Sequence, residues 1–177
     1  MNRRTALIPF LMLIALSAVA QMGGPPGPEV KKLDYFVGTW TSDGTIAQGP
    51  WGMGGKFTGS GTTEWLPGNF FVKTQAESQM PAEIGGDNKT VMIMGYDTQQ
   101  NTYTSDRFSS LGQHETSKGA LSGDTWTWTS ASNYGGIEVQ GKMTIKTVSP
   151  TSYTFKYEIS LDGKNWMPFM DGKATKK

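Results

Sequence analysis

Apolar and polar residues alternate along most of the chain after Gly38, and Gly, Pro, Asn and Asp interrupt the alternation at short intervals. Residues 152–161 show it most clearly, because every second side chain there is aromatic or aliphatic and those between are polar. Successive side chains of a β-strand point to opposite faces, so a period of two predicts strands with one buried face. No window after Gly38 has the period of a long amphipathic helix. The pattern therefore predicts an all-β domain.

Short turns divide this region into about ten predicted strands. They are expected at residues 39–46, 56–66, 70–78, 89–96, 102–108, 113–121, 125–129, 142–148, 152–161 and 166–173. Such a meander is typical of a single up-and-down antiparallel β-barrel, in which closure leaves no exposed strand edge. A two-sheet sandwich is the alternative architecture.

Two of the predicted strands carry large apolar side chains at alternate positions. Met92 and Met94 share one face of the strand at 89–96, and Trp126 and Trp128 share one face of a later strand. We expect all four to line the barrel interior. Methionine thioethers also bind Cu(I), but Met commonly fills irregular apolar space, so a core or lumen-lining role is favoured.

The residues before the first strand predict a plug for one end of the barrel. Val30, Leu33 and Phe36 lie at helical spacing after Pro28, which predicts one short helical turn over residues 29–36. The apolar face of this turn is expected to close the barrel.

The first strand begins at that closed end, where Trp40 is expected to form the floor. A ligand site is then expected at the opposite end, near Trp51 in the loop 47–55 and near the loop 80–88. Both loops combine glycines with apolar side chains and are candidate lids, unless these side chains only hold the loops in place.

The N-terminus predicts an export signal. Arg3 and Arg4 precede an apolar run at 6–16, and residues 18–20 (Ala-Val-Ala) form a cleavage site of small residues. General secretion is favoured over twin-arginine export, because the residues after the arginine pair match the twin-arginine signal weakly.

These features divide the chain into three parts. Residues 1–20 are the predicted signal peptide, 21–28 a Pro/Gly linker and 29–177 the barrel domain. The location predicted for the mature protein is periplasmic or extracellular, with no membrane anchor after signal cleavage. A single domain suits the 177 residues of the chain.

Net charge and cysteine content limit the partners and anchors that the mature chain can have. Removal of the two leader arginines leaves 14 basic residues against 15 acidic ones, so the net charge of the mature chain is −1. Nothing in this balance favours a nucleic-acid partner. The chain has no Cys, so the domain has no disulfide and no cysteine for a lipid anchor.

Three segments carry a resemblance to a known family. They are KLDYFVGTW at 32–40, MGYD at 94–97 followed by Tyr103, and DGKNW at 162–166. Together they resemble a bacterial family known as domain of unknown function 1579, over nearly the whole chain after the leader. The Gly-x-Trp element at Gly38 and Trp40 is similar to that of lipocalins and fatty-acid-binding proteins. The resemblance implies a small closed β-barrel with a lumen, in which these two residues are structural, and it supplies no catalytic residues.

The chain after the leader has one His, His114, and one Arg, Arg107. If their hairpin is symmetric about residues 110–111, Arg107 lies opposite His114 on a face that includes Tyr103. Turned inward, this face would bind a carboxylate or a similar anionic head group. In one alternative, this polar face is exposed to solvent. In a second, the hairpin loop has an odd number of residues, and Arg107 and His114 lie on different faces of the sheet. In a third, Arg107 stacks on Trp40 as a cation–π pair.

We expect no metal and no cofactor. One His without Cys does not supply the usual zinc ligands, and barrels of this kind that bind haem place the ligand His late in the chain, where this sequence has none. No Ser lies in a Gly-x-Ser-x-Gly setting. We therefore assign no catalytic residues.

The sequence leaves three hypotheses for function. The first is an exported barrel that binds a small hydrophobic or anionic amphipathic ligand in its lumen. The second is a barrel enzyme of the cyclase or isomerase type, and the third is a structural or protein-interaction domain without a ligand. The candidate ligand-binding residues are Arg107, His114, Tyr103, Trp126, Trp128, Met92, Met94 and Trp51.

Overall fold

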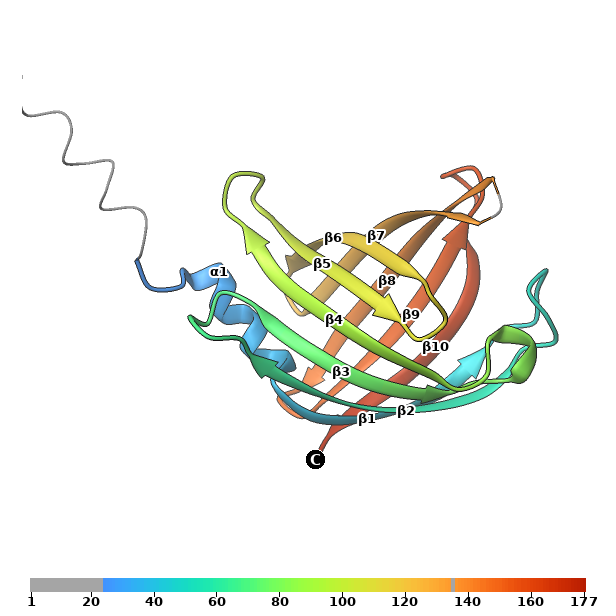
Figure 1. Ribbon diagram of the computed structural model, residues 1–177, viewed down its shortest axis with the longest axis horizontal. Helices are drawn as coiled ribbons and strands as arrows, with labels where there is room; N and C mark the ends of the chain where they lie inside the picture. The colour runs from blue at the N-terminus through green and yellow to red at the C-terminus, as the bar shows by residue number, and fades with distance from the viewer. Residues whose placement is uncertain (1–23, 135) are drawn as a thin grey trace, which may run out of the picture.

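A computed structural model describes residues 24–134 and 136–177 and shows a β-barrel with a short helical segment across one end (Figure 1). The helical segment consists of α1 (Pro28–Lys31) and the 3-10 helix η2 (Lys32–Phe36), as the spacing of apolar residues predicts. The strands are β1 (Gly38–Ile46), β2 (Gly55–Trp65), β3 (Val72–Gln79), β4 (Asn88–Asp97), β5 (Thr102–Ser109), β6 (His114–Ser122), β7 (Thr125–Tyr134), β8 (Ile137–Ser149), β9 (Ser152–Ser160) and β10 (Met167–Lys176). A second 3-10 helix, η3 (Ala82–Ile84), lies between β3 and β4. The predicted signal peptide and the first residues of the linker lie outside the described residues.

The strands form a closed antiparallel barrel in which each strand pairs with the next one along the chain. Pairing of β1 with β10, from Trp40 opposite Lys176 to Ile46 opposite Met170, closes the ring. The predicted up-and-down barrel is therefore confirmed and the sandwich alternative is wrong. Strands β7 and β8 run much further than predicted and meet at a turn around residue 136. Residues 130–134 are small or polar apart from Tyr134 and give no clear alternating signal. They pair with residues 137–141 within the same hairpin, so this pairing extends both strands beyond the predicted ends.

The helical segment seals one end of the barrel, as predicted. Leu33 is 0% exposed and Phe36 7% exposed, and both belong to the core cluster that includes Trp126. The indole N–H of Trp40 donates to the backbone oxygen of Phe36 at 2.8 Å. Lys176 Nζ lies 4.9 Å from the centre of the Trp40 ring. The cation on Trp40 is thus Lys176, and the alternative in which Arg107 stacks on Trp40 is wrong.

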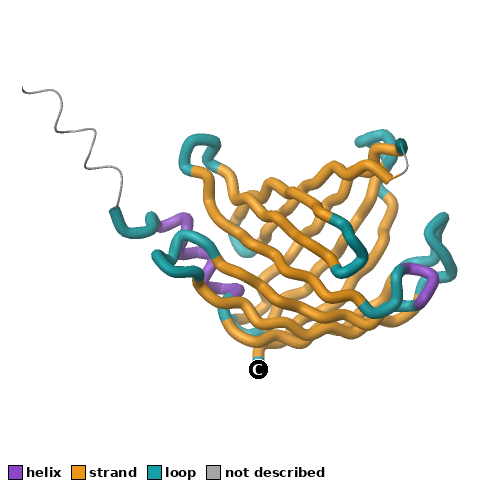
Figure 2. The backbone as a smooth tube through the Cα atoms, in the orientation of Figure 1, coloured by secondary structure: helices purple, strands orange, loops and turns teal. Residues whose placement is uncertain are grey.

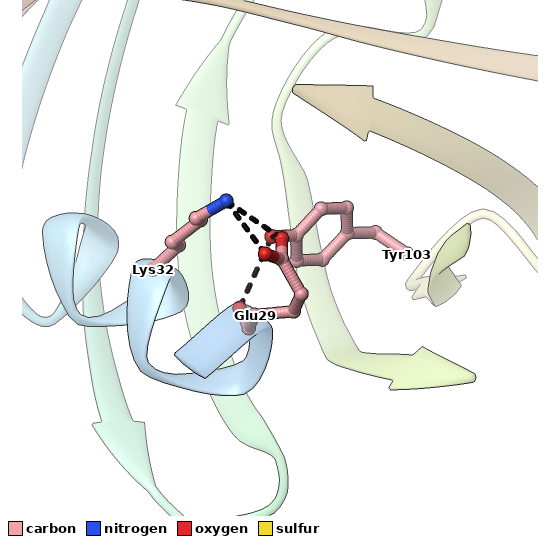
Figure 3. Close-up of polar contacts among 3 residues, drawn as sticks. All are labelled: Glu29, Lys32 and Tyr103. Carbon is pink, nitrogen blue, oxygen red and sulfur yellow. Dashed lines mark hydrogen bonds and ion pairs between the residues drawn. The ribbon is translucent and has the colours of Figure 1, made fainter. Parts of the chain in front are cut away.

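A polar cluster fastens α1 to the barrel wall (Figure 3). The Tyr103 hydroxyl donates to the Glu29 carboxylate at 2.9 Å, and Lys32 Nζ contacts both carboxylate oxygens at 2.8 and 2.7 Å. Hydrogen bonds from Lys32 and then from Tyr103 hold the pKa of Glu29 below its usual value. Burial, and secondarily Glu29, raise the pKa of Tyr103. The plug is therefore held by charge-assisted bonds as well as by apolar packing.

The other end of the barrel carries five connections, which the alternating strand directions bring together (Figure 2). Four of them span residues 47–54, 80–87, 110–113 and 161–166, and the one between β7 and β8 includes Gly136. None of the helices in the described part of the chain has the length and apolar character needed to cross a membrane.

Candidate functional site

The inner face of the barrel remains partly accessible above the plug. Met92 on β4, Arg107 on β5 and Ser117 on β6 alternate with outward-facing residues, and each is only half-buried. The backbone of the wall covers these side chains from outside, so their exposed area faces the lumen. This part of the inner face is the candidate site.

One half of the lumen wall is apolar and aromatic. It is formed by strands β8, β9, β10, β1 and β2, which are neighbours in the ring. Their inward side chains include Ile46, Phe57, Phe155, Tyr157, Ile159 and Met170. The rings of Phe57 and Phe155 lie 6.0 Å apart.

A β-bulge adds a further ring near the open end of this half. The pairing of β10 with β9 shifts between Pro168 and Met170, which leaves Phe169 as the extra residue. The Phe169 ring lies 5.8 Å from the ring of Tyr157 and 5.1 Å from that of Trp51. These contacts extend the aromatic surface to the rim.

The other half of the lumen wall is polar. It is formed by β3 to β7, and apart from Ala76 and Met92 the inward side chains above the plug carry hydroxyl, amide or charged groups. The uncharged polar ones include Asn88, Thr90, Ser105, Ser109, Ser117 and Ser130.

Arg107 is the cation of this polar half. It lies on the inner face between Met92 of β4 and Glu115 of β6, its partners in strand pairing. Among the described residues, its guanidinium makes no hydrogen bond, no ion pair within 4 Å and no ring contact. The cation is therefore available to a ligand, with the carboxylate of Glu115 as its neighbour.

His114 lies on the outside of the barrel. Its partner in pairing is Phe108, because the hairpin centres on Leu111 and not on the bond between residues 110 and 111. The imidazole stacks on the Phe108 ring at 4.6 Å, and Nε2 lies 3.1 Å from a carboxylate oxygen of Asp106. The pairing of Arg107 with His114 expected from a symmetric hairpin is wrong by one residue. The alternative with a loop of odd length is confirmed, because it places the two side chains on opposite faces.

The remaining sequence candidates lie in the floor or at the rim. Tyr103, Trp126, Trp128 and Met94 are 2 to 7% exposed and pack in the core cluster with the plug. Trp51 lies at the open end, where its indole N–H donates to the backbone oxygen of Ala47 at 2.7 Å. The three polar candidates Arg107, His114 and Tyr103 therefore do not meet at one place.

The two candidate lids lie beside each other at the rim. An added Cβ at Gly52 would lie 3.6 Å from the Cβ of Glu83, and one at Gly55 would lie 2.8 Å from the ring of Pro81. The loops 47–54 and 80–87 therefore form one continuous segment of the rim.

Two open grooves of about 660 and 560 Å³ lie on the outer surface. The first is lined mainly by outward side chains of β1 to β5, among them Gln75, Val91 and Phe108. The second is polar and includes Asp106 and Lys118. Neither groove includes Arg107 or Met92.

Shifted pKa values occur around the lumen, at its floor and its rim. Burial, with a smaller effect of Tyr35, raises the pKa of Tyr153 in the floor to about 12. At the rim, backbone N–H groups of Asn165 and Lys164 lower the pKa of Asp162. The described residues contain no group of three or more His, Asp or Glu side chains suited to hold a metal ion.

Sequence reasoning missed Glu115, Phe57 and Phe169 as lumen residues. The alternation along each strand shows which residues share a face with Glu115 and with Phe57. Which of the two faces points into the lumen depends on the register with the neighbouring strands. Pro168 was the available signal for the bulge, because Pro lacks the N–H that a regular ladder needs.

Comparison with known proteins places this barrel in a family. The model of a family described as "Protein of unknown function (DUF1579)" matches residues 25–176. The chain belongs to the DUF1579 family. The resemblance seen in the sequence is thereby confirmed. No functionally curated protein matches this DUF1579 member in sequence.

Two solved structures share the barrel fold of this chain. The crystal structure of Rv2717c from M. tuberculosis has a TM-score of 0.60 at 8% identity and covers 86% of this chain and 99% of its own. The S-type phycobiliprotein lyase CPES from Guillardia theta has a TM-score of 0.54 at 10% identity, with coverage of 83% and 91%. At these identities the likeness shows the fold alone.

Proposed function

We propose that this DUF1579 barrel is an exported protein that binds a small hydrophobic or amphipathic molecule in its lumen. The observation that carries the proposal is the half-buried inner face above the plug, where Met92 and Tyr157 remain partly accessible. Folded domains normally fill their interior to high density. A closed barrel that leaves apolar inner side chains accessible is suited to a ligand.

The accessible inner face favours this function over a structural domain with a filled core. The fold is shared with a protein named as a phycobiliprotein lyase. Binding requires only apolar surface and a few polar groups, and both are present in the lumen wall.

The binding test uses a bulky residue to fill the lumen. Ser117 points inward between Ser105 and Ser130, whereas the adjacent Thr116 points outward. We expect the neutral fluorophore N-phenyl-naphthylamine to bind the wild type and the Thr116→Trp control, and to bind Ser117→Trp much more weakly. Circular dichroism and thermal unfolding establish that both variants fold. Equal binding by all three folded proteins, or binding by none, overturns the proposal.

Native mass spectrometry of the protein purified from its producing cells gives an independent test. We expect a fraction of the wild type to carry an additional small molecule, and this fraction to fall in Ser117→Trp. Release of the same molecule by denaturation would provide its mass. Protein that carries the molecule to the same extent in both variants would contradict a lumenal site.

The export part of the proposal is tested separately. Expression of the full chain in a bacterial host, followed by cell fractionation and intact mass measurement, is expected to give a mature chain that begins at Gln21. An uncleaved chain retained in the cytoplasm would overturn export without affecting the binding proposal.

A further inference from the structure

The polarity of the lumen changes across the barrel. Five consecutive strands, β3 to β7, form the polar half, and the other five form the aromatic half. Ring closure places the two halves opposite each other. Strand β5, with Arg107, lies five places from β10, with Phe169, in the ring of ten, so these two strands face each other across the lumen.

Both halves extend between the floor and the rim. On the polar side, Ser105, Arg107 and Ser109 follow one another on the inner face of β5 from Tyr103 in the floor. On the aromatic side, Phe155 and Tyr157 lead from the floor toward Phe169 and Trp51. The polarity of the lumen wall therefore differs between its two sides and not between its floor and its rim.

This arrangement discriminates between two shapes of amphipathic molecule. A linear amphiphile has its polar group at one end of an apolar chain and matches a lumen that is polar at one end. A flat molecule with a polar edge matches a lumen that is polar along one side. Rings also gain from contact with the flat faces of aromatic side chains, which a flexible chain does not reproduce.

The charges of the polar half restrict the ligand further. The Arg107 guanidinium has no protein partner among the described residues, and its planar fork of donors matches a carboxylate or sulfonate. The Glu115 carboxylate, opposite Arg107 in the strand pairing, would repel a second anion and could accept a hydrogen bond from a ligand. A suitable ligand therefore has one acidic group at its polar edge, with room for a hydroxyl or amino group next to it.

We infer that the lumen binds a flat, ring-containing organic acid, with its rings against the Phe155–Tyr157–Phe169 wall and its acidic group on Arg107. This inference rests on the proposed lumenal function and specifies its ligand class. A linear fatty acid is the alternative that the test must exclude.

Three fluorescent probes test the ligand class. Anilinonaphthalene sulfonate and N-phenyl-naphthylamine share one ring system and differ in the sulfonate, and cis-parinaric acid is a linear carboxylate. A charge-assisted hydrogen bond is expected to make the sulfonate bind about tenfold more tightly than the neutral probe. We expect parinaric acid to bind more weakly than the sulfonate by a similar factor.

Variants at Arg107 identify the source of the preference. Arg107→Met is expected to remove the advantage of the sulfonate over the neutral probe, and Arg107→Lys to retain part of it. Glu115→Gln is expected to tighten sulfonate binding, because it removes a neighbouring negative charge. Lys146→Gln removes a cation from the exposed outer face and is the matched control, with no expected change.

The outcomes separate the two proposals. The flat-acid inference is overturned if parinaric acid binds as tightly as the sulfonate and loses affinity equally in Arg107→Met. It is also overturned if the sulfonate binds the wild type no more tightly than the neutral probe. In both cases lumenal binding stands. If no probe binds the folded wild type, the proposed function falls as well. Should Arg107→Met fail to fold, Arg107→Gln and Glu115→Gln provide the same comparison.

Discussion

Arg107 and His114 belong to adjacent strands of one hairpin, yet their side chains lie on opposite faces of the barrel wall. Arg107 pairs with Glu115 and points into the lumen, whereas His114 pairs with Phe108 and points outward. The inner face of the hairpin thus combines one cation with one carboxylate. The only imidazole of the chain is outside the candidate site.

His114 is therefore expected to be dispensable for lumenal binding. The His114–Asp106 pair is about half exposed on both sides, so His114→Ala should change the free energy of unfolding by less than about 1 kcal/mol. Affinity for N-phenyl-naphthylamine should be unchanged. Fluorescence titration and urea unfolding measure both quantities, and a large loss of affinity in a stable variant would place His114 in the site.

Gly119 is expected to be required for packing of the floor. It pairs with Trp128, and an added Cβ would lie 2.6 Å from the six-membered ring of that indole. Gly119→Ala should cost about 1–3 kcal/mol of the free energy of unfolding, because the floor is closely packed. Gly24→Ala, where the added methyl meets open space, is the control in chemical denaturation. Equal stability of the two variants would contradict close packing of Gly119 against Trp128.

Leu33 is expected to be the main apolar anchor of the plug. It is 0% exposed and contacts the core cluster, so Leu33→Ala should cost about 2–5 kcal/mol by removing buried methyl groups and leaving a cavity. Leu111→Ala, in an exposed turn, is the matched control and should stay within about 0.5 kcal/mol of the wild type. A small cost at Leu33 would mean that the helical segment is held mainly by its polar contacts.

Local patterns in the sequence predict most of the fold. Alternation identifies all ten strands, and helical spacing identifies Leu33 and Phe36 as the plug. The same alternation places Trp126 and Trp128 together on the inner face. These features depend on residues within one strand or helix, so the local sequence pattern is sufficient to predict them.

The lumen is less predictable because it depends on register. One residue in the turn after Ser109 decides whether His114 or Glu115 joins Arg107 on the inner face. The extra residue at Phe169 depends on the register between β9 and β10. The approach of Lys176 to Trp40 depends on pairing between β1 and β10, which are distant in sequence. No local pattern specifies those contacts.

The cluster of Glu29, Lys32 and Tyr103 makes the plug sensitive to acid. Because these hydrogen bonds lower the pKa of Glu29 in the folded state, its contribution is fully present above the unfolded pKa and is lost as pH falls through the lower folded value. We expect the wild type to be more stable than Glu29→Gln at neutral pH, and the difference to shrink from about pH 5 downward. Urea unfolding at a series of pH values measures it, with Glu83→Gln in the exposed loop as the control. A difference that stays constant down to pH 3 would show that the carboxylate charge does not stabilise the plug.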